Sequence, residues 1–384
     1  TNSDILLNYN ESFGNFSLDV SLGGNRMDQI FSSIQSQVLT LAVPGVFNLS
    51  NGASPIEIFQ NTYEKRINSA YGLAKFGFRD YVFVEVTGRN DWSSSLPNPS
   101  FFYPSVAATY VLSNAFSLPR QVSFAKLRAS WAQVGNDTSP YQTASTYTPS
   151  TPVNSLPTFT DASTIANANL LPEQTTAIEL GADVRFFDDR LSLDVTYYNA
   201  LTENQIISLP ISITSGYEEE VINGGEVRSQ GVEAIVSLVP VYKNNFTWRT
   251  QANFSRNVTT VETLPDNAGR ITLAYSSVYD NPNQAVYYQV EEGGRIGDMY
   301  GTGYLKNGNN EFIINSNGQY IVNNDLMLLG NYNPDFIIGW NNELAYKNWN
   351  ANFLFDWRHG GVLVSRIQAL AGVAGQLEET GYRP

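Results

Sequence analysis

The only histidine, His359, is the first candidate for chemistry, because an imidazole can act as a general base or as a metal ligand. It lies in the stretch FDWRHGG, with Ser365 close behind it. A hydrolase would need these two groups held together, and closeness in sequence does not establish that pairing. Cysteine is absent, and no second histidine exists to complete a metal site. We therefore predict no catalytic residue, no metal site and no enzyme activity, and place His359 at the outer end of a strand.

Two carboxylate runs and one glycine-rich stretch also have residue types found in ligand sites. Residues 218–220 and 291–292 are all glutamates, which could bind calcium or an oligosaccharide, although such runs are more often solvated loop surfaces. The glycines between residues 293 and 303 suggest a nucleotide-binding pattern, but no strand-turn-helix context accompanies them. We predict no cofactor.

Aromatic side chains with polar neighbours are stronger binding candidates, because sugar rings and peptides dock on exposed aromatic faces. The alternative is that these rings form a membrane girdle or pack the loops together. We predict substrate binding by two groups of side chains: Arg89, Asp91 and Trp92 beside SSSLPNPS, and Asp298, Tyr300 and Tyr304 around GTG.

The composition limits the partners. The net charge of −14 argues against a nucleic-acid partner, which would require a basic face. No apolar run is long enough for a transmembrane helix. The first residues, TNSDILLNYN, lack a signal-peptide pattern and have the alternation of a strand, so we interpret the chain as a piece of a longer protein.

Alternation of apolar and polar residues recurs along the whole chain. In LSLDVTYYNALTENQII (191–207), Leu191, Leu193, Val195 and Tyr197 share one face, with polar residues between them. TAIELGADVRF (176–186), FTWRTQANFS (246–255) and WNANFLFDW (349–357) show the same period of two. Repeated segments of about 9–11 such residues are typical of transmembrane β-strands, and about twelve are present. We expect the apolar face to contact lipid and the polar face to line a wet lumen.

The connections between these strands alternate in length, which is expected of a barrel with short periplasmic turns and long extracellular loops. The long segment 261–331 is predicted to contain no spanning strand, with a local hairpin at IINSNGQYIV. A soluble β-sandwich that binds glycans or mediates adhesion is the alternative from another class. The short turns are predicted at 78–80, 187–190, 240–245 and 346–348, and the long segments at 23–62, 91–101, 136–173, 206–222 and 261–331.

Six stretches, in chain order, carry a family resemblance: VTGRNDWSSSLPNPSFFYPSVAATYVLS (86–113), KLRASWAQVGNDTSPY (126–141), NLLPEQTTAIELGADVRFFDDRLSLDVTYYNALTENQII (169–207), NGGEVRSQGVEAIVSL (223–238), GRIGDMYGTGY (294–304) and LGNYNPDFIIGWNNELAYKNWNANFLFDWRHGGVLVS (329–365). Together they resemble the SusC/RagA-like TonB-dependent transporters of Bacteroidetes-type outer membranes. The family's plug domain, its TonB-interacting segment and both barrel termini are not recognised in this chain.

The resemblance implies an all-β fold: an antiparallel transmembrane β-barrel portion in the outer membrane, supplying about twelve strands of a larger barrel of 22. Residues 1–384 would form this partial barrel, with long extracellular loops at 23–62, 136–173 and 261–331. It also implies TonB-dependent import of oligosaccharides or peptides, a SusD-like surface lipoprotein as partner, and contact with TonB through the plug. A siderophore or cobalamin receptor is the alternative within transport.

Overall fold

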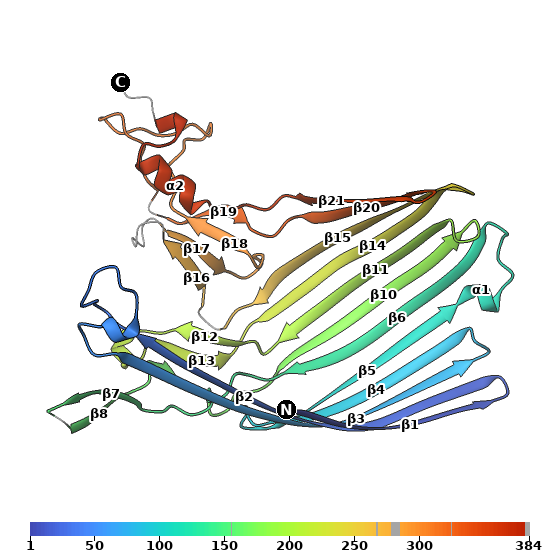
Figure 1. Ribbon diagram of the computed structural model, residues 1–384, viewed down its shortest axis with the longest axis horizontal. Coiled ribbons are helices and arrows are strands. Elements are labelled where there is room, and N and C mark those ends of the chain that lie inside the picture. The colour runs from blue at the N-terminus through green and yellow to red at the C-terminus, as the bar shows by residue number, and fades with distance from the viewer. Residues whose placement is uncertain (155, 266–267, 278–284, 324, 381–384) are drawn as a thin grey trace.

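The computed structural model describes residues 1–154, 156–265, 268–277, 285–323 and 325–380 of this chain. Its main feature is one antiparallel sheet in which each strand pairs with the next spanning strand of the chain (Figure 1). The sheet has twelve strands: β1 (Asn2–Phe13), β2 (Phe16–Gln37), β3 (Glu57–Phe78), β4 (Val82–Ser93), β5 (Ser100–Val111), β6 (Val122–Asn136), β10 (Glu173–Phe186), β11 (Leu191–Glu203), β14 (Glu226–Lys243), β15 (Phe246–Thr263), β20 (Phe336–Tyr346) and β21 (Trp349–His359). The predicted number of strands is confirmed.

The alternation of short and long connections is confirmed with one exception, since the connection after β4 (94–99) is shorter than the one after β5 (112–121). The tight turns lie at one edge of the sheet and the long segments at the opposite edge, because successive strands are antiparallel neighbours (Figure 1). We call these edges the short-turn rim and the long-loop rim. One connection at the short-turn rim, residues 112–121 with helix α1 (Leu112–Ala115), is longer than a turn and was not predicted. No described part of 261–331 forms a strand of the main sheet except the end of β15, as expected, although Arg295 makes an isolated β-bridge with Thr260 of β15.

Several predicted boundaries are wrong in the same direction, because strands continue past the apolar belt. β2 and β3 stay paired from Phe16↔Phe78 to Gln37↔Glu57, so the connection predicted at 23–62 is only residues 38–56. The segment 91–101 contains only six connecting residues, 94–99, between β4 and β5. Polar residues occupy both faces beyond the belt, so alternation no longer marks the strand there. The turn predicted at 240–245 shrinks to 244–245, since β14 continues to Lys243 after an irregularity near Val239.

The tight turns have backbone angles that match strand twist. Positive φ values occur at Arg79 and Asp80, at Asp188 and Asp189, and at Lys347. Such left-handed residues join strands whose own right-handed twist would otherwise be opposed by the turn. These turns therefore fix the register in which the neighbouring strands pair.

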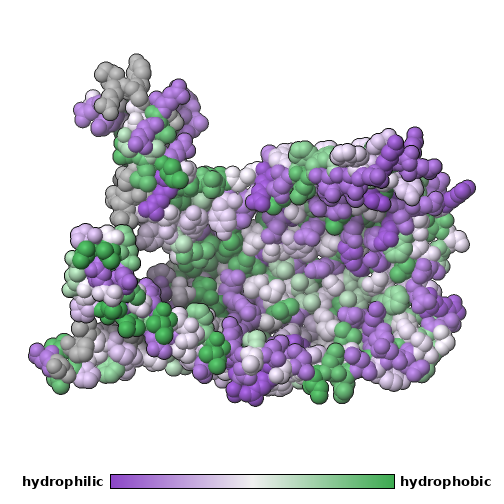
Figure 2. All heavy atoms as spheres, in the orientation of Figure 1, coloured by the Kyte–Doolittle hydropathy of each residue, from purple (hydrophilic) through white to green (hydrophobic). Residues whose placement is uncertain are grey.

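The two faces of the sheet differ as the alternation predicts. On β10, Leu180 is 52% exposed, and its cross-strand neighbour Tyr197 is 41% exposed. On the opposite face, Asp183 is 7% exposed and lies near Lys126 at 3.5 Å, while Arg128 binds Asp194. Figure 2 shows hydrophilic and hydrophobic side chains interspersed over the side of the molecule that it draws. An apolar face this exposed, opposite a face with internal ion pairs, is suited to lipid outside and water inside.

Two polar residues on the lipid-facing side have their own hydrogen-bond partners. Asn342 interrupts the apolar alternation of β20 and is 1% exposed. The indole N–H of Trp248 donates to its Oδ1 at 3.1 Å, and the indole of Trp340 donates to Thr250 Oγ1 at 2.7 Å. The tryptophans therefore satisfy the acceptor oxygens of Asn342 and Thr250, whereas Asn342 Nδ2 is buried without a hydrogen-bond partner.

Smaller elements occupy the long-loop rim, apart from α1 (Figure 1). They comprise the pair β7 (Thr148–Val153) and β8 (Leu156–Thr160), the sheet β12 (Ile206–Pro210), β13 (Glu219–Asn223) and β9 (Thr164–Ile165), the sheet β16 (Ile271–Ser277), β17 (Ala285–Val290), β18 (Asp298–Gly301) and β19 (Met327–Asn331), helix α2 (Arg366–Val373), and 3-10 turns at Leu49–Asn51, Ile213–Ser215 and Glu378–Thr380. Among the described residues, no helix combines the length and the apolar character needed to cross a membrane.

The assignment of faces predicts an asymmetric effect of charge on β10. Leu180→Lys should lower the unfolding free energy of the membrane-inserted protein by about 2–4 kcal/mol if Leu180 lies near the bilayer midplane. Glu179→Lys, one residue away on the lumen side, should change it by less than about 1 kcal/mol. Urea unfolding of the whole protein in lipid vesicles measures both. Equal losses at the two positions would contradict the assignment.

Candidate functional site

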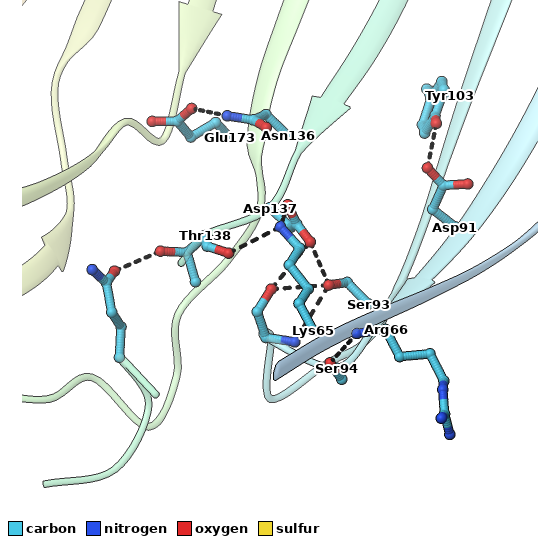
Figure 3. Close-up of polar contacts among 12 residues, drawn as sticks. Lys65, Arg66, Asp91, Ser93, Ser94, Tyr103, Asn136, Asp137, Thr138 and Glu173 are labelled. Atoms are coloured by element: carbon cyan, nitrogen blue, oxygen red, sulfur yellow. Dashed lines mark hydrogen bonds and ion pairs between the residues drawn. The ribbon is translucent and has the colours of Figure 1, made fainter. Parts of the chain in front are cut away.

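A partly buried ion pair lies where three segments meet at the long-loop rim (Figure 3). Lys65 Nζ of β3 is 2.5 Å from Asp137 Oδ1, just after β6, and also donates to the carbonyl of Thr138 at 3.2 Å. The other carboxylate oxygen of Asp137 accepts hydrogen bonds from the hydroxyls of Ser93 and Ser95. The side chains of Lys65 and Asp137 are 17% and 8% exposed. We call Lys65, Ser93, Ser95 and Asp137 the rim junction.

The local sequence explains why these residues meet. The three serines of DWSSSLP form the tip between β4 and β5, and Ser94 exchanges hydrogen bonds with the backbone of Arg66. Gly135, two residues before Asp137, lets the Phe101 ring lie against β6, since a Cβ there would be 2.5 Å from the ring. Two stretches that carry the family resemblance, 86–113 and 126–141, therefore converge on one carboxylate.

An apolar cluster beside the rim junction joins three of the long connections. Leu96, Leu170 and Val221 are buried together, and Leu170 is fully buried. They come from the connections after β4, β6 and β11, respectively. The Asn223 side chain exchanges hydrogen bonds with the backbone of Leu171 at 2.7 and 2.9 Å. The connections therefore form one packed layer at the rim.

The first predicted binding group divides between the two faces of β4. Arg89 donates to Asp91 at 2.8 Å and to Ser69 Oγ at 2.8 Å, and the Tyr103 hydroxyl donates to Asp91 at 2.5 Å. These side chains form one polar cluster on the lumen side. Trp92 is 42% exposed and points to the opposite face, because neighbours in a strand alternate. All three residues lie within β4, so the expectation that Trp92 belongs to a loop is wrong.

The second predicted group is divided as well. Tyr300 in β18 is only 4% exposed, and its hydroxyl donates to Glu291 at 3.0 Å. The Arg270 guanidinium lies 4.3 Å from the centroid of the Tyr300 ring. Asp298 accepts hydrogen bonds from the Arg295 backbone and from the Asn331 side chain. Tyr300 and Asp298 therefore hold the four-stranded loop sheet together.

The electrostatics of this sheet follow from the same contacts. Hydrogen bonds from Arg270 and then from Tyr300 lower the pKa of Glu291. Burial first, and then the hydrogen bond to Glu291, raises the pKa of Tyr300. The ionised Glu291 with a neutral Tyr300 is therefore the form that the fold stabilises.

Tyr304 lies in a different structure, which sequence reasoning missed. Residues 304–327 contain three units of eight residues, YLKNGNNE, FIINSNGQ and YIVNNDLM. The backbones of Leu305, Ile313 and Ile321 close a ring of hydrogen bonds, and the predicted hairpin at 313–322 is part of it. The first residues of the three units have ring centroids 5.2–6.1 Å apart and side chains 47–54% exposed. We call these residues, Tyr304, Phe312 and Tyr320, the aromatic knob; the repeat of eight was the signal that could have revealed it.

His359 has a packing partner and no catalytic one in the described chain. Its ring stacks on Phe336 with centroids 4.7 Å apart, at the end of β21, where it was placed from the sequence. Ser365 accepts a hydrogen bond from the Gln368 backbone and caps helix α2. In the residues that the structure describes, no group of three histidine, cysteine, aspartate or glutamate side chains is arranged to hold a metal ion.

Comparison with known proteins places this geometry in a family. Residues 1–355 match the family described as "TonB dependent receptor-like, beta-barrel". TonB-dependent receptor P3 of Formosa agariphila is 29% identical over 95% of this chain and 39% of the relative, and receptor P26 of the same organism is 25% identical over 94% and 39%. The chain thus spans about two fifths of the length of these relatives.

Solved structures agree on the fold. The RagAB peptide transporter superposes with a TM-score of 0.77 at 18% identity, covering 93% of this chain and 41% of that one. The outer membrane transporter YddB of Escherichia coli gives a TM-score of 0.52 at 11% identity, covering 90% and 47%.

The rim junction predicts a large effect of one carboxylate. Asp137→Asn leaves the partly buried Lys65 without a counter-charge and should lower the free energy of unfolding by about 1.5–3 kcal/mol, if the rim unfolds with the barrel. Asp356→Asn removes a partner from the exposed pair with Arg358 (54% and 71% exposed) and should cost about 0–1 kcal/mol. Denaturant unfolding of the whole protein compares the two. Similar small losses would mean that the junction does not stabilise the rim.

The loop sheet should weaken in acid. The pKa of Glu291 is lower in the folded state, so its stabilising contribution is present above the unfolded pKa and is lost as pH falls through the folded value. Hydrogen-exchange protection of residues 285–301, corrected for intrinsic rates, should therefore decrease from pH 7 toward pH 3. Glu291→Gln should be less protected at pH 7 and should show much less of this decrease. The same pH dependence in both proteins would exclude Glu291 as the cause.

Proposed function

This chain belongs to the TonB-dependent receptor-like β-barrel family, whose members are outer-membrane transporters and not enzymes, and we propose that the whole protein imports peptides or oligosaccharides. The strands that close the barrel would then come from the parts of the protein outside this chain. They would pair with β1 and β21, whose outer edges have no partner strand in the described sheet.

The observation that carries the proposal is the extent of the likeness to the RagAB peptide transporter. It covers 93% of this chain with a TM-score of 0.77, and so includes the loop layer as well as the barrel wall. That similarity, at 18% identity, is evidence for the fold, and a peptide cargo is our extension of it. Together with the family resemblance of the sequence, it supports a SusC-like importer over other kinds of TonB-dependent receptor.

The long-loop rim is the surface where we place a SusD-like lipoprotein lid. The rim junction and the Leu96 cluster hold the connections in one layer, which gives a lid a defined surface to meet. The aromatic knob adds exposed rings beyond that layer. A stable partner surface needs such ordered aromatic contacts, because ordering a mobile loop would reduce the affinity.

We propose that cargo contacts are shared between lumen wall and loops. Arg89 offers a partly exposed guanidinium on the lumen side, suited to the polar groups of a peptide or sugar, and the buried Asp91 holds it in place. Tyr304 offers an exposed ring, and Asp298 and Tyr300 act by holding its loop sheet in place. Trp92 would serve as an outer girdle ring or a contact at the rim.

The test is a strain in which the gene for the whole protein is deleted and then restored. Uptake of labelled oligopeptides, oligosaccharides, ferric siderophore and cobalamin should be compared between the two strains, with and without TonB. We expect TonB-dependent loss of peptide or oligosaccharide uptake in the deletion strain. Loss of siderophore or cobalamin uptake alone would support the alternative cargo, and unchanged uptake of all four would contradict the proposal.

The aromatic knob gives a residue-level prediction. Tyr304→Ala should weaken lid capture or cargo uptake at least about threefold, because it removes one of the three exposed rings of the knob. Tyr242→Ala removes a tyrosine that is more exposed than Tyr304 (73% against 47%) from the short-turn rim and should change neither. Affinity purification of the lid and uptake assays, at matched surface levels, measure the effect. Equal behaviour of the two variants would mean that the knob contacts neither lid nor cargo.

A further inference from the structure

A groove of about 760 Å³ crosses the lipid-facing side of four neighbouring strands, β5, β6, β10 and β11. Its walls are apolar side chains on the outward positions, including Leu127, Tyr110, Leu180 and Tyr197. It is a shallow, open depression, so it suits a ligand that lies along the wall. The groove belongs to the barrel wall and is separate from the rim junction and the knob.

Alanines make the floor of the groove. Ala129 of β6 lies between Ala108 of β5 and Leu180 of β10 in one cross-strand row. Ala182 of β10 pairs with Leu127 in the next row. Small side chains flanked by larger ones leave a channel in a surface that would otherwise be even. Hydrocarbon is the medium on this side of the sheet, so an acyl chain is the occupant that the groove fits.

The groove reaches the short-turn rim, where aromatic rings line the same side. Tyr81 and Val82, which line its end, follow the turn between β3 and β4. Neighbouring rings of this row have centroids 4.9–6.2 Å apart, and the row consists of Phe16, Phe78, Tyr81, Tyr110 and Phe116. Rings of this kind occupy the level of the lipid headgroups. The end of the groove therefore lies in the periplasmic leaflet, which contains phospholipid.

A cation stands above this row. The Arg79 guanidinium lies 5.3 Å from the centroid of the Phe78 ring. Its turn is fixed, because the Arg79 N–H donates to the Asn15 carbonyl at 2.8 Å and the Asn114 side chain donates to the Asp80 carbonyl at 2.9 Å. Arg79 forms no ion pair with a carboxylate in the described part of the chain. A guanidinium held at headgroup level is suited to a phosphate.

We propose that this groove is a specific site for one glycerophospholipid of the periplasmic leaflet, with an acyl chain on the alanine floor and its phosphate at Arg79. The site goes beyond the proposed transport function and rests only on the outer-membrane location. A bound lipid here would fill a defect in the outer wall and link four strands on both sides of the connection 112–121.

Native mass spectrometry of the whole delipidated protein, with palmitoyl-oleoyl phosphatidylglycerol added, tests the site. Ala129→Leu fills the floor and should lower the affinity for the first bound lipid at least about tenfold. Arg79→Gln should lower it about threefold or more, through the lost charge-assisted contact. The matched controls are Ala252→Leu, an outward alanine outside the groove, and Lys347→Gln, a cation over the Tyr346 ring at another turn of the same rim.

Both controls should stay within about twofold of the wild type. Thermal unfolding of each variant checks that the barrel is intact. Equal affinity in all five proteins would mean a shell of non-specific lipid only and would overturn the proposal. Recovery of lipid A, in place of phospholipid, on protein purified gently from outer membranes would overturn it as well, since lipid A belongs to the other leaflet.

Discussion

Every feature of this chain depends on one constraint, which is that backbone N–H and C=O groups have no water to bind inside a membrane. A sheet in which each spanning strand pairs with the next one satisfies these groups along its whole length. Such pairing allows tight turns at one rim, apart from residues 112–121, and the longest connections lie at the other rim. It also gives each strand an outer and an inner face. Leu180 therefore faces lipid and Glu179 faces water, although the two residues are adjacent.

The long loops lie outside the membrane, so contacts between their own side chains must keep them ordered. The Lys65–Asp137 pair and the Leu96 cluster anchor three connections to the ends of strands. The hydrogen bond from Tyr300 to Glu291 stabilises the separate four-stranded sheet of the long loop. Exposed groups such as Tyr304 are therefore carried on ordered loops, and binding residues are commonly found on loops that a rigid scaffold positions.

Sequence reasoning reached the fold because alternation and connection length are local signals. It placed twelve strands, the rims and the position of His359 at the end of a strand correctly. It misjudged the ends of β2, β3 and β4, where polar residues occupy both faces in water and the period carries no information. It grouped Tyr300 with Tyr304 by spacing, although burial separates them. Lys65 and Asp137 lie far apart in the chain, so only the folded register brings their charges together.

The long-loop rim should face the cell exterior, and the short-turn rim should face the periplasm. The chain contains no cysteine, so a single introduced thiol can be labelled selectively within it. Asn309→Cys in the loop and Lys347→Cys in a short turn should be treated, within the whole protein on intact cells, with a membrane-impermeant maleimide. The account predicts labelling at position 309 on intact cells, and at position 347 only after the outer membrane is opened. Labelling of position 347 on intact cells, or of 309 only after opening, would contradict it.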